Sequence, residues 1–150
     1  MKKLICAVIA LVLLTSCSQY AEPDVSALME ELLSGQDTEE MTAATAEEVG
    51  ILFDIDLSLT EDFAVSYSGK GGCADIVAIF KLSSKDDAPD AAAVLEKYRE
   101  DRYNDFLGYA PFEAEKIENG RVLTYGRYVI LIVLPDTDSA LSAAEKAFKA

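Results

Sequence analysis

Histidine and tryptophan are both absent from this 150-residue chain. Without histidine, the chain lacks the usual near-neutral base, and the Ser-His-Asp and Cys-His catalytic arrangements are excluded. Cysteine is scarce as well, because only Cys6, Cys17 and Cys73 occur. Cys6 falls in a predicted signal peptide and Cys17 in a predicted lipidation site, so Cys73 has no disulfide partner within the exported domain. We predict no catalytic residues, no metal and no cofactor.

Basic residues are also few. The chain has 13 Lys and Arg against 27 Asp and Glu, a formal net charge of −14. Nucleic acid as a partner is excluded by this balance, because its phosphates require basic side chains. A second, electrostatic contact with anionic lipid headgroups is disfavoured for the same reason.

No apolar run in the first segment is long enough to span a bilayer, which takes about 20 residues. Lys2 and Lys3 precede the apolar residues 4–14, an arrangement typical of a secretory signal. Residues 14–17 read Leu-Thr-Ser-Cys and resemble a bacterial lipobox. We therefore predict a lipoprotein signal peptide at 1–16, lipid on Cys17, and attachment to the outer face of the bacterial cell membrane. An ordinary cleaved signal or an N-terminal anchor helix are the alternatives.

Two further regions follow the predicted signal. Residues 17–44 are expected to form a lipidated N-terminus and a tether, with one short helix over 25–33 that Asp24 caps and Gly35 ends. Residues 45–150 are expected to form a single α+β domain. This domain begins with a second short helix from Thr45 to Phe53, in which Glu48 completes a capping box.

The rest of the chain repeats the order hairpin, then helix. Strands are predicted at 63–67 and 75–82. A long helix with Pro89 in its first turn is predicted to run to about Leu107, where Gly108 and Pro111 end it. A second pair of strands is predicted at 121–125 and 128–134, and a last helix begins at Asp136 or Asp138. The predicted fold is therefore a four-stranded, mainly antiparallel sheet with both of these helices on one face.

Two of the predicted strands are apolar on both faces, at residues 76–80 and 129–134. An antiparallel sheet with one face in water should alternate apolar and polar residues. Something must therefore cover the second face. The short helices at 25–33 and 46–53 are one candidate, and a partner protein or a second copy of the chain is the other.

The order of several segments resembles a known family. After the lipobox come Met41-Thr42, Leu52-Phe53-Asp54-Ile55-Asp56, Ile76-Val77-Ala78-Ile79-Phe80-Lys81, Ile117-Glu118-Asn119 and Gly126-Arg127-Tyr128-Val129-Ile130-Leu131. Over residues 25–149 this order is similar to a family of short lipoproteins of gut Clostridia and related Firmicutes, catalogued only as a domain of unknown function. The resemblance implies a cell-surface lipoprotein and assigns no catalytic residue. The Gly-Gly-Cys turn at 71–73 departs from it.

Two clusters of arginine and tyrosine are the candidate binding residues: Arg102 with Tyr103, and Arg127 with Tyr128. Both residue types are enriched at binding hot spots. The alternative is that the tyrosines lie in the core and the arginines pair with nearby carboxylates.

Three other motifs lack what their chemistry needs. The Asp54-Ile55-Asp56 start of a calcium loop is not followed by the required Gly and Glu. Residues 69–72, Gly-Lys-Gly-Gly, lack the spacing of a phosphate-binding loop. Cys73 has Lys70 nearby, but Asp75 opposes formation of a thiolate. We interpret these residues as turns, caps and an incidental cysteine.

The sequence thus favours a lipid-anchored, non-enzymatic protein-interaction module. Its partner would be a membrane-bound or wall-associated protein, with a homodimer as one version. Binding of a small ligand or of a cell-wall polymer is the alternative function. A hydrolase using two carboxylates is a more distant alternative, because nothing singles out two of the 27 acids.

Overall fold

A computed structural model describes residues 20–38 and 40–150, so the predicted signal peptide and Cys17 lie outside the described residues. Five strands form one antiparallel sheet in the order β1-β2-β3-β5-β4. The strands are β1 (Met41–Ala43), β2 (Thr60–Ser68), β3 (Ile76–Leu82), β4 (Arg121–Tyr125) and β5 (Tyr128–Val133). The α-helices are α1 (Val25–Leu33), α2 (Ala46–Leu52), α3 (Ala88–Leu107), α4 (Pro111–Asn119) and α5 (Thr137–Ala147). The predicted α+β class is confirmed.

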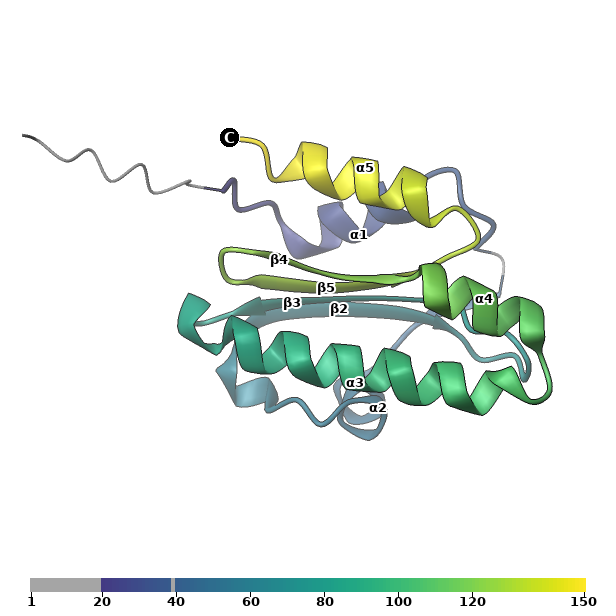
Figure 1. The fold of residues 1–150 in the computed structure, drawn as a ribbon. Helices are drawn as coiled ribbons and strands as arrows, with labels where there is room; N and C mark the ends of the chain where they lie inside the picture. Colours follow the sequence, from purple (N-terminus) through teal and green to yellow (C-terminus); the bar gives the residue numbers. More distant parts are fainter. Residues whose placement is uncertain (1–19, 39) are drawn as a thin grey trace, which may run out of the picture.

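Helices cover both faces of the sheet, which gives three layers (Figure 1). Along β3, Val77 and Ile79 point into a core shared with α1 and α5, whereas Ala78 and Phe80 point into a core shared with α2, α3 and α4. The prediction that both main helices lie on one face is wrong, because α3 and α5 lie on opposite faces. Strands that are apolar on both faces require this double cover.

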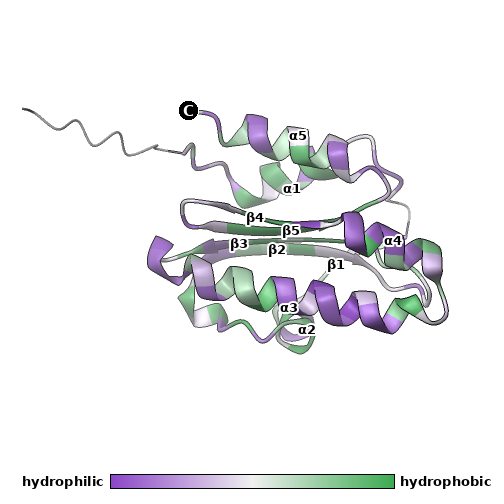
Figure 2. Cartoon of the chain, in the orientation of Figure 1, coloured by the Kyte–Doolittle hydropathy of each residue, from purple (hydrophilic) through white to green (hydrophobic). Residues whose placement is uncertain are grey.

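The second apolar face is covered by the chain itself. Of the two short helices considered for this role, α1 covers that face together with α5, whereas α2 packs with α3 on the other side. In Figure 2 the hydrophobic sides of α1 and α5 face the sheet. In the described part of the chain, no partner or second copy is needed to shield the doubly apolar strands.

The segment 17–44 contributes more structure than a tether with one helix. Residues 41–43 form the edge strand β1, which pairs with residues 66–68 of β2. The sheet therefore has five strands rather than four. Such a short strand, outside the doubly apolar core, carries too little periodicity to be recognised in the sequence.

Capping residues set the ends of the short helices as expected. Asp24 accepts a hydrogen bond from the backbone N–H of Ala27 at 2.9 Å and begins α1. Thr45 and Glu48 form the reciprocal capping box of α2. Asp136 accepts from the N–H of Ser139 at 3.0 Å and begins α5.

Helix α4 was not predicted. Pro111 was interpreted as the end of the preceding helix, but it occupies the first turn of a new one, where its missing N–H costs nothing. Gly120 follows α4 and passes close to β5. A Cβ atom there would lie 2.7 Å from a methyl group of Val133, so only glycine allows this approach.

None of the helices in residues 20–38 and 40–150 combines the length and apolar character required to cross a bilayer.

Candidate functional site

The two predicted arginine–tyrosine clusters lie at opposite ends of β3. Arg127 accepts a backbone hydrogen bond from Leu82, the last residue of that strand. Arg102 lines a groove with Ile76, the first residue of the strand. The structure therefore does not bring the four candidate residues into one site, and each cluster is considered separately.

Arg127 makes ion pairs with two carboxylates from distant parts of the chain. Its guanidinium bonds both oxygens of Glu22, at 3.0 and 2.6 Å, and it also bonds Glu61. These hydrogen bonds raise the pKa of Arg127 and lower the pKa of Glu22 and of Glu61, so all three groups stay charged at neutral pH. Lys81 joins the same group through Glu61 at 2.7 Å.

Tyr128 is a core residue, with only 1% of its surface exposed. Its hydroxyl donates to the carbonyl of Pro23 at 2.7 Å, and its ring packs edge-on against Phe148. Arg127 and Tyr128 therefore hold the N-terminal segment and α5 against the second hairpin.

Arg102 is bound less tightly. Its guanidinium lies 4.6 Å from the centre of the Phe106 ring and 3.9 Å from the carboxylate of Asp105. Tyr103 is half-buried and packs against the core beneath α3. The Arg102 side chain is 38% exposed against 22% for Arg127, so Arg102 is the more accessible of the two candidate arginines.

Arg102 borders a groove of about 500 Å³ at the Ile76 end of β3. We call this the distal end and the Leu82 end the proximal end. The walls come from α2, from the loop between β2 and β3, and from α3. Four aromatic residues line it: Tyr67, Tyr98, Phe106 and Tyr109. Burial raises the pKa of Tyr98, so its hydroxyl remains neutral well beyond physiological pH.

Beside the groove, the α3–α4 corner exposes three large apolar side chains within six residues. The exposed fractions are 51% for Leu107, 63% for Tyr109 and 87% for Phe112. Figure 2 shows hydrophobic segments at this corner, where α3 ends and α4 begins. We call these three residues the apolar corner. Single exposed apolar residues are common, but a group of them is typical of an interaction surface.

A second groove, with a volume of about 530 Å³, lies beside Phe112 and is lined by acidic side chains. Its carboxylates are Glu115, Asp136 and Asp138. Of the groove's two basic residues, Lys116 is paired internally and Arg121 donates to the carbonyls that end α4, at 2.8 to 3.1 Å. Within the described residues, Glu115 and Asp138 form no ion pair. We call these three carboxylates the acidic rim.

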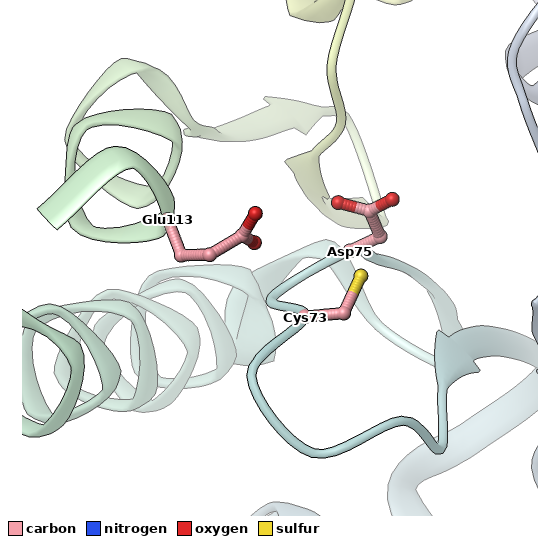
Figure 3. Close-up of side chains that lie close together, drawn as sticks. All are labelled: Cys73, Asp75 and Glu113. Carbon is pink, nitrogen blue, oxygen red and sulfur yellow. The ribbon is translucent and has the colours of Figure 1, made fainter. Parts of the chain in front are cut away.

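A third cluster joins α4 to the loop before β3. Figure 3 shows Cys73 and Asp75 from the loop and Glu113 from the helix, with their side chains converging. One potential ligand atom from each lies within 4.8 Å of the others, a spacing that a metal ion could use. Lys116 already provides a cation there, since its Nζ is 2.5 Å from Asp75 and 2.9 Å from Glu113.

The position of Lys116 favours a structural role for this cluster. Burial alone would lower the pKa of Lys116, but the hydrogen bonds to Asp75 and Glu113 outweigh it and the pKa is raised. Glu113 also accepts the backbone N–H of Ala74 at 2.8 Å. The ammonium thus bridges two carboxylates and fixes α4 beside the loop.

Sequence reasoning missed this cluster and the apolar corner. Asp75 and Lys116 are 41 residues apart, and nothing in either local sequence indicates that they meet. The corner was passed over because α4 was missed. The string Leu-Gly-Tyr-Ala-Pro-Phe at 107–112, apolar and without a charge, was the available signal.

One family model matches the chain, over residues 34–134, and its description is "Domain of unknown function (DUF4358)". The chain belongs to this family. The match confirms the predicted membership of a family with no assigned function. Searches of curated proteins and of solved structures found no match.

The family match covers most of the candidate features of the distal end, but it omits the N-terminal segment and two carboxylates of the acidic rim, Asp136 and Asp138. The apolar corner, the groove beside Arg102 and the Lys116 cluster all lie within residues 34–134. Helices α1 and α5, which cover the second face of the sheet, lie outside it.

Proposed function

We propose that this DUF4358 protein is a lipid-anchored, non-enzymatic interaction module that binds a protein through its apolar corner. The observation that carries the proposal is that Leu107, Tyr109 and Phe112, all exposed, lie within six residues at one corner of the fold. Burying such side chains against a partner is favourable by about 25 cal/mol per Å² of apolar surface.

The acidic rim indicates the kind of partner. Carboxylates flank Phe112, and the nearby basic groups are already paired within the chain. An apolar segment bordered by Lys or Arg would complement both features. The net charge of −14 favours encounter with such a cationic surface.

The anchor is supported by the sequence motif that ends at Cys17, which lies outside the described residues. Two acyl chains on this cysteine would give lasting attachment to the outer face of the membrane. The partner would then be a membrane-bound or wall-associated protein within reach of that surface.

In-cell crosslinking of the full chain followed by mass spectrometry tests this function. We expect one dominant partner, which is lost with Cys17→Ala and with Phe112→Ser. Ile51→Ser is the matched control, because Ile51 is also a largely exposed apolar residue but lies on α2. Unchanged crosslinking of Phe112→Ser, or loss with Ile51→Ser alone, would contradict a surface at the corner.

The alternative, binding of a small ligand or wall polymer, is favoured by one observation. The groove beside Arg102 places Tyr109, which is 63% exposed, and the half-buried Tyr98 where their rings can stack on a sugar. Retention on purified peptidoglycan that falls with Arg102→Ala, but not with Phe112→Ser, would favour this function. Arg127, committed to Glu22 and Glu61, provides the internal control.

A further inference from the structure

We infer that residues 20–24 fasten the protein body directly to its anchor, so that the body has a fixed orientation on the membrane with the apolar corner directed away from the lipid. This inference rests on the proposed lipid at Cys17. It replaces the flexible tether expected from the sequence. We call residues 20–24 the N-terminal strap.

The strap begins with contacts to the second hairpin and to the C-terminal end of α5. The ring of Tyr20 packs edge-on against that of Tyr125, with centroids 5.5 Å apart. The N–H of Ala21 donates to the carbonyl of Phe148 at 3.3 Å. The strap thus contacts the body from its first described residue.

The centre of the strap is held by charge. Glu22 accepts two hydrogen bonds from the fork of Arg127, an arrangement stronger and more directional than a single ion pair. Lys81 lies 3.8 Å from the same carboxylate. Glu61 bonds both Arg127 and Lys81, so the strap joins a network of four charged side chains.

The end of the strap continues into buried structure. The carbonyl of Pro23 accepts from the buried hydroxyl of Tyr128, and Asp24 caps α1. Helix α1 buries Val25, Leu28 and Leu32 against the sheet. No free segment therefore separates the strap from the folded body.

The distance available between lipid and body is short. Three residue steps connect Cys17 to Tyr20, and a fully extended chain covers at most about 3.6 Å per residue, so roughly 11 Å is the limit. The end of the molecule that holds the strap must therefore lie next to the headgroups. Lys85 and Gly126 line the same small pocket as Tyr20 and Arg127, and so belong to this proximal end.

The distal end faces the opposite way. In Figure 1 the α3–α4 corner lies at the far end of the sheet from the strap and the C-terminus. The seven residues of β3 alone span about 23 Å between these ends. The orientation therefore presents the apolar corner to a partner beyond the membrane surface and keeps it out of the lipid.

Fluorescence quenching by the membrane surface tests the inference. The full chain carrying Cys73→Ser is produced lipidated and placed in phosphatidylcholine vesicles that contain a nitroxide-headgroup lipid. One thiol is introduced for a fluorophore, either as Lys85→Cys at the proximal end or as Gly71→Cys at the distal end. Both positions are exposed, and a Cβ at Gly71 meets open space. We expect a quenching ratio of position 85 to position 71 well above one.

A matched pair of chains shows whether the strap sets this ratio. Inserting about 20 Gly and Ser residues between Gln19 and Tyr20 adds a root-mean-square span of roughly 25 Å and should bring the ratio to about one. Arg127→Gln should lower the ratio, whereas Arg102→Gln should leave it unchanged. The intact mass of each preparation reports the lipid independently.

The outcomes separate the inference from the anchor on which it rests. A lipidated chain with equal quenching at both positions, or stronger quenching at position 71, would overturn the fixed orientation and leave the anchor intact. A mass without lipid would overturn the anchor and this inference together. A high ratio that the inserted linker does not change would show that something other than the strap orients the body.

Discussion

At each end of the sheet a basic side chain bridges two carboxylates, but the two ends differ in how much apolar surface they expose. At the proximal end, Arg127 bridges Glu22 and Glu61; at the distal end, Lys116 bridges Asp75 and Glu113. In each case one cation ties together segments that are far apart in the sequence. Tyr128 beside Arg127 is only 1% exposed, whereas Phe112 beside Lys116 is 87% exposed.

This difference shows that a cluster of arginine and tyrosine does not by itself indicate a binding site. In the proximal cluster, Arg127 and Tyr128 contact other parts of the same chain, namely the strap and the end of α5. At the distal end, Lys116 is paired with Asp75 and Glu113, whereas Leu107, Tyr109 and Phe112 remain exposed. Grouped apolar side chains that remain exposed in the folded chain are the better indication of contact with another molecule.

The largest expected effect comes from opening the proximal core. Tyr128→Ala removes a buried ring and should lower the free energy of unfolding by about 3–5 kcal/mol. Tyr128→Phe, which loses only the hydrogen bond to Pro23, should cost about 1 kcal/mol. Urea unfolding of a chain that begins at Ser18 provides the measurement. Equal losses for the two variants would contradict the packing described for Tyr128.

Removing the distal cation should have the next largest effect. Lys116→Met leaves Asp75 and Glu113 facing each other without a cation, and we expect a loss of roughly 2–3 kcal/mol, below the 3–5 of a fully buried pair. The same variant frees the three potential ligands at Cys73, Asp75 and Glu113. Urea unfolding with and without Zn²⁺ should show stabilisation in the variant and none in the wild-type chain. Zn²⁺ stabilisation of the wild type would show that Lys116 does not occupy the position.

Charge reversal at the acidic rim should weaken binding without affecting the fold. Exchanging Glu115 and Asp138 for Lys changes two side chains that form no ion pair within the described residues. Asp138 lies in the first turn of α5, where replacing its negative charge by a positive one should cost about 1 kcal/mol of stability. Partner capture should fall and lose its salt dependence. The matched control reverses Glu30 and Glu31, two exposed residues of α1 that lie outside the rim and form no ion pair among the described residues. An equal fall of partner capture in the control would mean that the net charge of the protein, and not the acidic rim, determines binding.

The smallest effect is expected from titrating the strap. The pKa values of Glu22 and Glu61 are lowered in the folded chain, first by hydrogen bonds to Arg127 and to Lys81 respectively, from an ordinary value of 4.5. Their contribution is therefore complete above pH 4.5 and is lost as the pH falls through the lowered folded values.

Amide hydrogen exchange at Ala21, corrected for intrinsic rates, should thus accelerate at acid pH. Arg127→Gln should show fast exchange already at neutral pH, with little further change on acidification. Arg102→Gln at the distal end should behave like the wild type. Slow exchange at Ala21 in the Arg127 variant would mean that the aromatic contacts hold the strap without the ion pairs.

Local signals in the sequence predicted local structure well. Asp24 and the Thr45–Glu48 pair marked the starts of α1 and α2, because capping acts over three residues. The strands β3 and β5 were recognised from their continuous apolar character. The same character correctly required cover on a second face, and α1 was one of the two expected sources.

What the sequence could not supply was contact between distant segments. Arg127 is 105 positions from Glu22 and 66 from Glu61, so the local sequence could not predict that it pairs with both carboxylates. The repeated hairpin and helix suggested two helices on one face, although helix position depends on which side each connection crosses the sheet. Pro111 illustrates the limit at short range, because a proline that ends one helix can begin another.

Site-specific photocrosslinking in living cells shows whether a protein partner meets the apolar corner or the proximal end. A photoreactive amino acid replaces Phe112 in one chain and Lys85 in another, both in the full-length protein. If the apolar corner binds a protein and the proximal end faces the lipid, we expect a discrete protein adduct at position 112 and only lipid adducts, or none, at position 85. A protein adduct at position 85 with none at position 112 would contradict it.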